Sequence, residues 1–333
     1  MRSIAVLTCL ICLVGSLARA DARPMCARDE ALSAAASALL MGPRDLSAAS
    51  ITHALREAGS DAPLAHAIVV PTDGLVALRN WMTELLRTTD APLICGDASN
   101  GRERLRVVST RAGSLESSPQ RPAQFRVRVS APFRDARAVA LDSHGGAHTL
   151  EITGTADERF VVVPDDLSSP LLLQLVAVGP QGPRPVAERA IGAWRDVSAA
   201  GDAGASLESR VDAMRARDHL SALRPNRLLQ EVAARHARSV CESGRVGHTV
   251  EPGADPEARL RAQGMVARVV GETVARARDN AAAFQSFVAS PSHHATLADP
   301  RFTDIGVASE SDAQGRQCVV IMLAAWPRIV PAN

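Results

Sequence analysis

The sequence contains no tyrosine and no lysine, and it has only six phenylalanines and three tryptophans among 333 residues. Arginine therefore carries all 37 strong positive charges, against 36 acidic residues, and the formal net charge is +1. Binding to nucleic-acid phosphates needs a basic surface, so this even balance argues against a nucleic-acid partner. The apolar content of 46% is sufficient for a packed core. At roughly 100–200 residues per domain, the length predicts two or three domains.

Several sequence patterns typical of enzymes are also missing. The chain has no G-x-S-x-G turn, no H-E-x-x-H zinc-protease motif and no phosphate-binding loop. No cysteine has a histidine partner in the context of a nucleophile. These absences make an enzyme less expected without excluding one.

The one long apolar run lies at the N-terminus. MRSIAVLTCLICLVGSLARA has a charged start at Arg2, apolar residues from Ile4 to Leu17, and the small-x-small sequence Ala18-Arg19-Ala20. This predicts a secretory signal peptide over residues 1–20, cleaved near Ala20 and too short to favour a membrane span. We therefore expect a secreted or periplasmic protein without a transmembrane segment. Its partner would be an unknown ligand of the envelope or the extracellular space.

Four cysteines remain after removal of the signal peptide: Cys26, Cys95, Cys241 and Cys318. An even number of cysteines in an exported chain indicates disulfides, with three possible pairings. We expect Cys26–Cys95 and Cys241–Cys318, because each pair falls within one predicted domain. Buried free thiols are the alternative.

The first two thirds of the chain divide by hydrophobic period. Residues 21–115 predict a mainly helical domain, with helices near 27–42, 47–59 and 73–87 and a terminal hairpin that turns at Asn100-Gly101. Residues 114–124 read as a polar connector. Short alternating and buried-type strands over 120–193 predict a small β-sandwich, in which His144 and His148 flank a surface turn. Residues 194–206 read as a flexible linker.

Two short segments far apart in the chain resemble each other. Gly96-Asp97-Ala98-Ser99, followed by Val107-Val108, is similar to Gly306-Val307-Ala308-Ser309, followed by Val319-Val320. A decayed internal duplication is one interpretation, and coincidence is the other.

The last third, residues 207–333, carries the most informative patterns. Apolar residues recur at helical spacing over 226–244 and place His236 on the buried face, where a hydrogen-bonded core histidine is expected. Ser290 and Pro291 are suited to the start of a short helix that presents His293 and His294. The closing strand, GRQCVVIMLAAW, is apolar at consecutive positions, so both of its faces should be covered. Helices around such a sheet predict an α-β-α sandwich, and the whole chain falls in the α+β class.

Three motifs in this region match a known pattern. VGHT at 246–249, GETVA at 271–275 and SPSHHATLADPRFTDIGVA at 290–308 occur in that order. Together they resemble the bacterial branch of the CAP superfamily of cysteine-rich secretory, antigen and pathogenesis-related proteins, over about residues 207–326. The resemblance implies a cleft in which His248, Glu272 and His293 meet. His294 stands where arginine is commoner and should face solvent.

The chemistry implied by this cluster has two forms. His248 and His293 could bind zinc or another divalent cation, with Glu272 as a ligand or as the partner that orients an imidazole. The function expected is an exported CAP-domain binding module, and the alternative is a metal-dependent or His/Glu-based hydrolase of peptide, cell-wall or lipid substrates. A scaffold with a vestigial cleft is a third possibility. Three departures from the family pattern and the lack of a second glutamate in 280–289 weaken the hydrolase; the departures are Thr273, Ser292 and Thr296.

Overall fold

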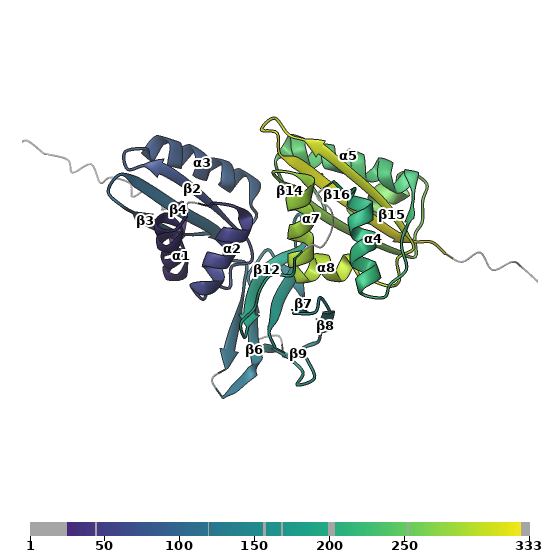
Figure 1. Ribbon diagram of the computed structural model, residues 1–333, viewed down its shortest axis with the longest axis horizontal. Helices are drawn as coiled ribbons and strands as arrows, with labels where there is room; N and C mark the ends of the chain where they lie inside the picture. The colour runs from purple at the N-terminus through teal and green to yellow at the C-terminus, as the bar shows by residue number, and fades with distance from the viewer. Residues whose placement is uncertain are drawn as a thin grey trace, which may run out of the picture.

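A computed structural model describes residues 25–43, 45–118, 120–155, 158–167, 169–198, 204–251 and 253–327. The signal peptide predicted over residues 1–20 and part of the predicted linker lie outside these ranges. Two α/β lobes lie side by side, and a β-sandwich lies against both (Figure 1). The α+β class is confirmed. None of the helices within the described ranges is long and apolar enough to cross a bilayer.

The N-terminal lobe, residues 25–110, is built on a four-stranded sheet with the order β1-β3-β4-β2. Helices α1 and α2 pack on one face of this sheet, and α3 packs on the other. The sheet contains a strand, β2, that the sequence did not indicate, because its alanines and histidine give no clear alternation. The elements are β1 (Ala27–Arg28), α1 (Glu30–Met41), α2 (Ala48–Glu57), β2 (Ala65–Pro71), α3 (Leu75–Thr88), β3 (Leu93–Ser99) and β4 (Glu103–Thr110).

The sandwich, residues 113–191, packs two four-stranded sheets face to face around one apolar core. One sheet holds β5 (Gly113–Ser118), β6 (Arg121–Val129), β10 (Arg159–Val162) and β9 (Ile152–Gly154). The other holds β12 (Gly182–Ile191), β11 (Leu171–Gly179), β7 (Arg134–Asp142) and β8 (Ala147–Leu150). The interpretation of residues 114–124 as a connector is wrong, since they contribute to the β5–β6 hairpin. Few side chains there are buried, Leu115 being one, so the segment looks polar.

The C-terminal lobe, residues 204–327, has three layers, as the sequence predicted. Its sheet has the order β13-β15-β16-β14, with α5 on one face and α4, α7 and α8 on the other. No residue from Cys318 to Ala325 in β16 is more than 1% exposed, because both faces of this strand are covered. The elements are α4 (Leu207–Arg217), β13 (Arg224–Pro225), α5 (Arg227–Ser243), α6 (Pro256–Arg261), β14 (Val269–Ala277), α7 (Asn280–Ala289), α8 (Pro291–Leu297), β15 (Asp304–Ser311) and β16 (Gln317–Ala325).

The two lobes share one plan. In each, a short first strand pairs in parallel with the third, and the fourth strand lies between the third and the second. In each lobe a glycine of the third strand lets the helix that follows the first strand cross closely. A Cβ added to Gly96 of β3 would lie 2.1 Å from Leu32 C of α1, and one added to Gly306 of β15 would lie 2.2 Å from Gln230 N of α5. The similarity around Gly96 and Gly306 therefore marks equivalent positions, as a duplication would.

The second half of that sequence similarity is not equivalent. Gly96 pairs with Val107 in the N-terminal lobe, but Gly306 pairs with Met322 in the C-terminal lobe. Val319-Val320 therefore does not correspond to Val107-Val108, because the β15–β16 hairpin is longer than the β3–β4 hairpin.

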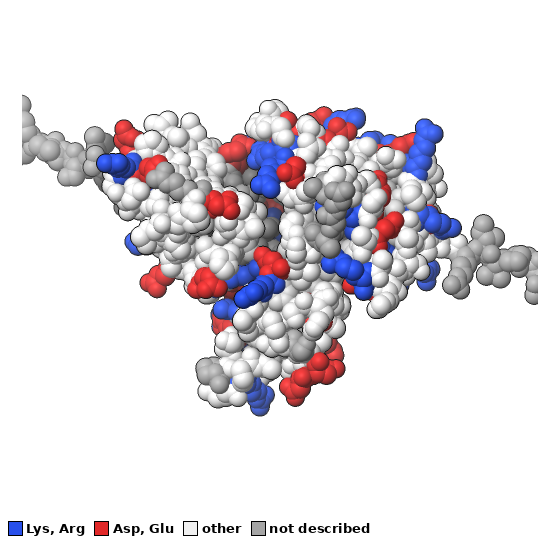
Figure 2. Space-filling model, viewed as in Figure 1, with Lys and Arg blue, Asp and Glu red and all other residues white. Residues whose placement is uncertain are grey.

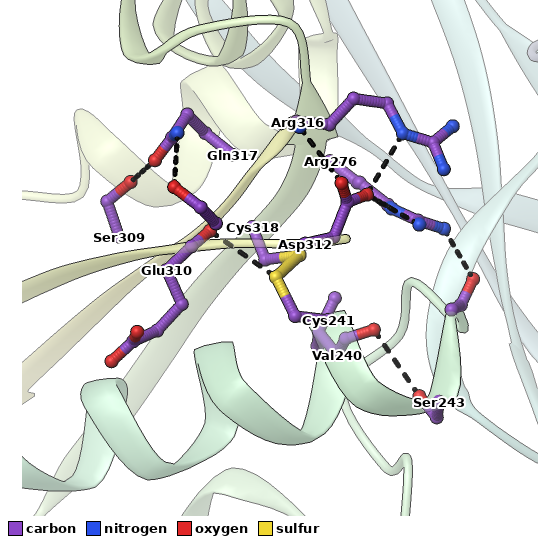
Figure 3. The surroundings of a disulfide bond; sticks show 12 residues. Val240, Cys241, Ser243, Arg276, Ser309, Glu310, Asp312, Arg316, Gln317 and Cys318 are labelled. Carbon is purple, nitrogen blue, oxygen red and sulfur yellow. Dashed lines mark hydrogen bonds and ion pairs between the residues drawn. A yellow bond between two sulfur atoms is a disulfide. The ribbon is translucent and has the colours of Figure 1, made fainter. Parts of the chain in front are cut away.

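Both expected disulfides are present, and the alternative of buried free thiols is wrong. Cys26 is bonded to Cys95 in the N-terminal lobe, and Cys241 to Cys318 in the C-terminal lobe. The second bond ties α5 to β16 beside a buried carboxylate, Asp312 (Figure 3). Each disulfide therefore links elements of a single lobe.

Candidate functional site

A buried carboxylate in the C-terminal lobe gathers three basic side chains. The Glu272 side chain is 1% exposed, and its Oε1 accepts a hydrogen bond from His248 Nδ1 at 2.9 Å. Its Oε2 forms an ion pair with Arg259, and His236 Nε2 lies 3.7 Å from Oε1. We call Glu272, His248, His236 and Arg259 the Glu272 cluster.

The fold explains why these four residues meet. Val270 and Val274 of β14 pack in the core beneath α5. Glu272 lies between them at a spacing of two residues, so its side chain is on the same face of the sheet. His236 projects from the buried stripe of α5 toward that face. Arg259 comes from α6, whose N-terminus is capped by Asp255, and also donates to the backbone carbonyl of His248 at 2.8 Å. Arg259 thus ties the loop that carries His248 to the sheet.

The charges of the cluster fix its proton positions. Burial alone would raise the pKa of Glu272, but the hydrogen bond from His248 and the basic side chains around the carboxylate, Arg259 among them, lower it below its ordinary value. The ionised carboxylate can only accept, so Nδ1 of His248 carries a proton. The Nε2 lone pair of a neutral His248 is then left for a ligand or a proton.

His236 is the hydrogen-bonded core histidine that the sequence predicted. Its side chain is 3% exposed, and its Nε2 donates to the carbonyl of Gly247 at 3.0 Å. Burial lowers its pKa, and the Glu272 charge offsets this only in part. We infer that His236 is neutral near pH 7 and supports both the carboxylate and the His248 loop.

His293 lies on α8, at the edge of the C-terminal lobe's helical layer that also holds α4 and α7. Among the described residues, no hydrogen bond or ion pair joins His293 to Glu272 or to His248. The ring is partly buried with its centroid 5.3 Å from that of Phe287, and its Nδ1 is buried without a hydrogen-bond partner. Burial, with the nearby charges of His248 and Arg137, lowers the pKa of His293 to about 3, so the ring is neutral at pH 7.

The expectation that His294 faces solvent is wrong. His294 is 1% exposed, its Nδ1 donates to the carbonyl of Val288 at 2.9 Å, and its Nε2 lies 3.8 Å from Asp218 Oδ2. The reason is that α8 packs against the sandwich strands β7, β8 and β11 as well as against its own lobe. Sequence patterns within the C-terminal third do not reveal that the sandwich also buries this side of α8.

The turn with His144 and His148 is held by a carboxylate. His148 Nε2 lies 2.9 Å from Asp142 Oδ2, and His144 is exposed. More generally, the described part of the chain contains no group of three or more histidine, cysteine, aspartate or glutamate side chains arranged to hold a metal ion.

A cavity of about 340 Å³ opens beside α5 and α6 and reaches one side of the Glu272 cluster. His236 and Arg259 belong to both the cavity wall and the cluster. The remaining wall combines charged side chains of both signs with small and uncharged ones: Arg235, Arg238, Ser239, Glu242, Glu251, Ala254, Ala262 and Gln263. Charges of both signs are likewise interspersed over the face drawn in Figure 2.

The sequence motifs located two of the four cluster members, His248 and Glu272. His236 was expected in the core but not beside Glu272. Arg259 was missed, because an arginine in the short polar segment PEARLR resembles any solvated helix residue. Its only local signal is the helix start at Asp255-Pro256, which places a defined helix next to the His248 loop.

Comparison with known proteins supports the motif assignment. Residues 208–323 match the CAP family, described as the cysteine-rich secretory protein family. No curated protein matches the chain.

Three solved structures are similar in part. An outer surface protein from Borrelia burgdorferi is 21% identical over 36% of this chain and 90% of its own, with a TM-score of 0.35. An extracellular SCP-domain protein from Bacillus anthracis str. Ames is 13% identical over 64% and 81%, with a TM-score of 0.33. A cysteine-rich secretory protein from Staphylococcus aureus subsp. aureus is 13% identical over 65% and 82%, with a TM-score of 0.30.

Proposed function

Residues 208–323 form a domain of the CAP, or cysteine-rich secretory protein, family, and from this premise we propose that the protein is an exported binding module. It acts at the cell envelope or outside the cell, in the periplasm or after secretion, and binds a divalent cation such as zinc through His248 and His293. The observation that carries the metal proposal is the state of two ring nitrogens, Nε2 of His248 and Nδ1 of His293.

Both nitrogens are suited to a cation. Glu272 holds the proton on Nδ1 of His248 and so leaves Nε2 free, the arrangement in which a carboxylate orients a metal-binding imidazole. Nδ1 of His293 is buried without a hydrogen-bond partner, and its ring is neutral. Glu272 itself is occupied by His248 and Arg259, so water would complete the coordination. Two protein ligands support weaker binding than a four-ligand structural zinc site.

Export is supported by the disulfides. Bonds such as Cys26–Cys95 and Cys241–Cys318 persist in oxidising compartments and are rare in a reducing cytosol. They agree with the N-terminal sequence pattern of a signal peptide.

A hydrolase is the second candidate, favoured by the pair His248–Glu272. An imidazole held in one orientation by an ionised carboxylate is the arrangement of a general base. The substrate would be a peptide, a cell-wall polymer or a lipid ester.

Calorimetric titration of chelator-treated protein with zinc tests the metal proposal. The variant His248→Ala/His293→Ala should lose the binding seen in the wild type, whereas His53→Ala/His144→Ala, which removes two histidines elsewhere, should retain it. Equal loss in both variants, or no binding in the wild type, would refute the site. A hydrolytic screen of the wild type against His248→Ala then separates the binding module from the hydrolase.

A further inference from the structure

A turn of the sandwich lies against the loop that carries His248. The carbonyl of Gln181, in the turn between β11 and β12, accepts hydrogen bonds from the backbone N–H groups of His248 at 2.9 Å and Thr249 at 3.0 Å. The two segments are joined by main-chain bonds, although they belong to different domains. We call residues 179–182 the covering turn.

Two glycines make this close approach possible. A Cβ added to Gly182, which has a φ of +91°, would lie 2.9 Å from Cβ of His248. A Cβ added to Gly247 would lie 2.8 Å from Cβ of Gln181. Since real Cβ atoms do not approach so closely, any side chain at either position would push the covering turn away from His248.

The same turn also reaches the N-terminal lobe. Gln181 is only 4% exposed, and its Nε2 donates to Asp90 Oδ1 at 3.2 Å. One residue of the sandwich therefore contacts both lobes: its carbonyl binds the His248 loop, and its side chain binds the loop between α3 and β3.

Little of the Glu272 cluster is exposed. The exposed fractions of the side chains are 16% for His248, 13% for Arg259, 3% for His236 and 1% for Glu272. The cavity beside α5 and α6 is lined by His236 and Arg259 but by neither His248 nor His293. The covering turn therefore meets His248 at its backbone N–H and beside its Cβ, and 16% of the His248 side chain stays exposed.

We propose that the covering turn is a releasable, autoinhibitory cover over His248, held in place by Gln181. This inference rests on the proposed function, because it concerns access to the same site. In the closed state the cluster admits a small ion, and a larger partner gains access only when the turn moves.

The hydrogen bonding of the turn is suited to release. Oε1 of Gln181 and Oδ2 of Asp90 are both buried without a hydrogen-bond partner. Buried acceptors without partners oppose the closed state, because opening would return them to water. The body of the sandwich is anchored better: Gln174, which is 1% exposed, accepts from the N–H of Ser292 at 3.1 Å and donates to Glu188 at 2.9 Å. Movement is therefore expected in the turn rather than in the whole sandwich.

Amide hydrogen exchange on the full chain tests for this opening without any ligand. The N–H groups of His248 and Thr249 should exchange on the order of tenfold faster than those of β16, through a local opening that needs no global unfolding. Exchange of residues 246–251 as slow as that of β16 would overturn the proposal.

Acylation of histidine by diethyl pyrocarbonate, followed by mass spectrometry, tests whether the turn controls access. In the wild type, His248 should react more slowly than the exposed His144. Gly182→Val should raise the His248 rate several-fold, and Gly101→Val, at a turn with a similar φ of +87° and nothing within 4 Å, should not. Asp90→Ala provides a second test, because it removes the partner of Gln181 from another lobe and should raise the same rate.

Unchanged His248 reactivity in both Gly182→Val and Asp90→Ala would overturn the cover. Neither readout involves a metal, so the cover can fail while zinc binding stands, and zinc binding can fail while the cover stands.

Discussion

Two buried carboxylates of the C-terminal lobe, Glu272 and Asp312, are stabilised in different ways. Glu272 is held by side chains from three separate segments, so its partners report on how those segments are placed. The Asp312 side chain is also 1% exposed, but most of its partners lie within the β15–β16 hairpin. It accepts from the backbone N–H group of Gln314. It also accepts from the backbone N–H group of Arg316 and pairs with Arg276 of β14 at 2.5 Å (Figure 3). Glu272 therefore belongs to the candidate site, whereas Asp312 fixes a turn.

The environment of Asp312 predicts a pH dependence of stability. Burial alone would raise its pKa, but hydrogen bonds from the Arg316 backbone and from Arg276 lower the pKa well below its ordinary value. As pH falls, the unfolded chain takes up this proton first. The stability that Asp312 contributes is thus present above about pH 4 and lost below it.

We expect Asp312→Asn to lower the free energy of unfolding by about 3 kcal/mol at pH 7, because it leaves the largely covered Arg276 without its charge partner. Its stability should also change less with pH below 4 than that of the wild type. Asp97→Asn, at an exposed pair with Arg106, should cost less than about 1 kcal/mol. Urea denaturation from about pH 2.5 to 7 provides the comparison. Parallel pH curves for the wild type and Asp312→Asn would contradict the assignment.

At the scale of elements, each lobe has a glycine where a helix crosses the third strand, and no other described glycine of that lobe leaves less room for a Cβ. Gly306 lets α5 approach β15, and Gly96 does the same for α1 and β3. Neither glycine has a positive φ, so an alanine there would meet only steric resistance.

Gly306→Ala should therefore destabilise the C-terminal lobe by about 3 kcal/mol, because the new methyl group must displace α5 from its sheet. Gly96→Ala should have a similar effect on the N-terminal lobe. Gly315→Ala, at an open turn with a φ of +75°, should cost only about 1 kcal/mol of backbone strain. Thermal denaturation of the three variants checks this, and equal costs at Gly306 and Gly315 would argue against a steric crossing.

Strongly periodic elements could be predicted from sequence, and weakly patterned ones could not. The stripe of α5 and the continuous apolar run of β16 are determined by their own residues, and both were found. β2 and β5 were missed, because few of their side chains are buried and pairing with a neighbour makes them strands. Within the site, motif order revealed His248 and Glu272. The prediction that His294 faces solvent was wrong, because its burial depends on contacts with the sandwich, which the local sequence does not specify.

At the scale of the whole molecule, only the C-terminal lobe carries the cluster among the described residues. Leu229 of α5 and Leu32 of α1 are equivalent, because each lies against the crossing glycine of its lobe. His236 comes seven residues after Leu229, and the residue seven positions after Leu32 is Leu39. In the C-terminal sheet, Gly306 pairs with Met322, which pairs on its other side with Glu272. In the N-terminal sheet, Gly96 pairs with Val107, which pairs on its other side with Ala67, so Ala67 is the equivalent of Glu272.

The N-terminal lobe thus repeats the plan with apolar residues at the two positions of the site. Its link to the site is indirect: Asp90 accepts a hydrogen bond from Gln181 of the covering turn, which belongs to the sandwich.

The disulfides allow the independence of the lobes to be tested. The bonded cysteines are 69 residues apart in the N-terminal lobe and 77 in the C-terminal lobe. Loops of this size correspond to about 4 kcal/mol each from the chain entropy removed in the unfolded state. Because neither disulfide connects two domains, removing one of them should destabilise only the lobe that contains it.

Cys26→Ala/Cys95→Ala should accelerate hydrogen exchange in β4 while leaving β16 slow, and Cys241→Ala/Cys318→Ala should do the reverse. The second pair should also weaken the hold of α5 on the sheet and so loosen the Glu272 cluster, whereas the first should leave zinc affinity unchanged. If either pair accelerated exchange in both lobes equally, the contacts through the sandwich would have to couple them into one cooperative unit. Exchange measured on both variants distinguishes these cases, because a lobe that unfolds alone leaves the other protected.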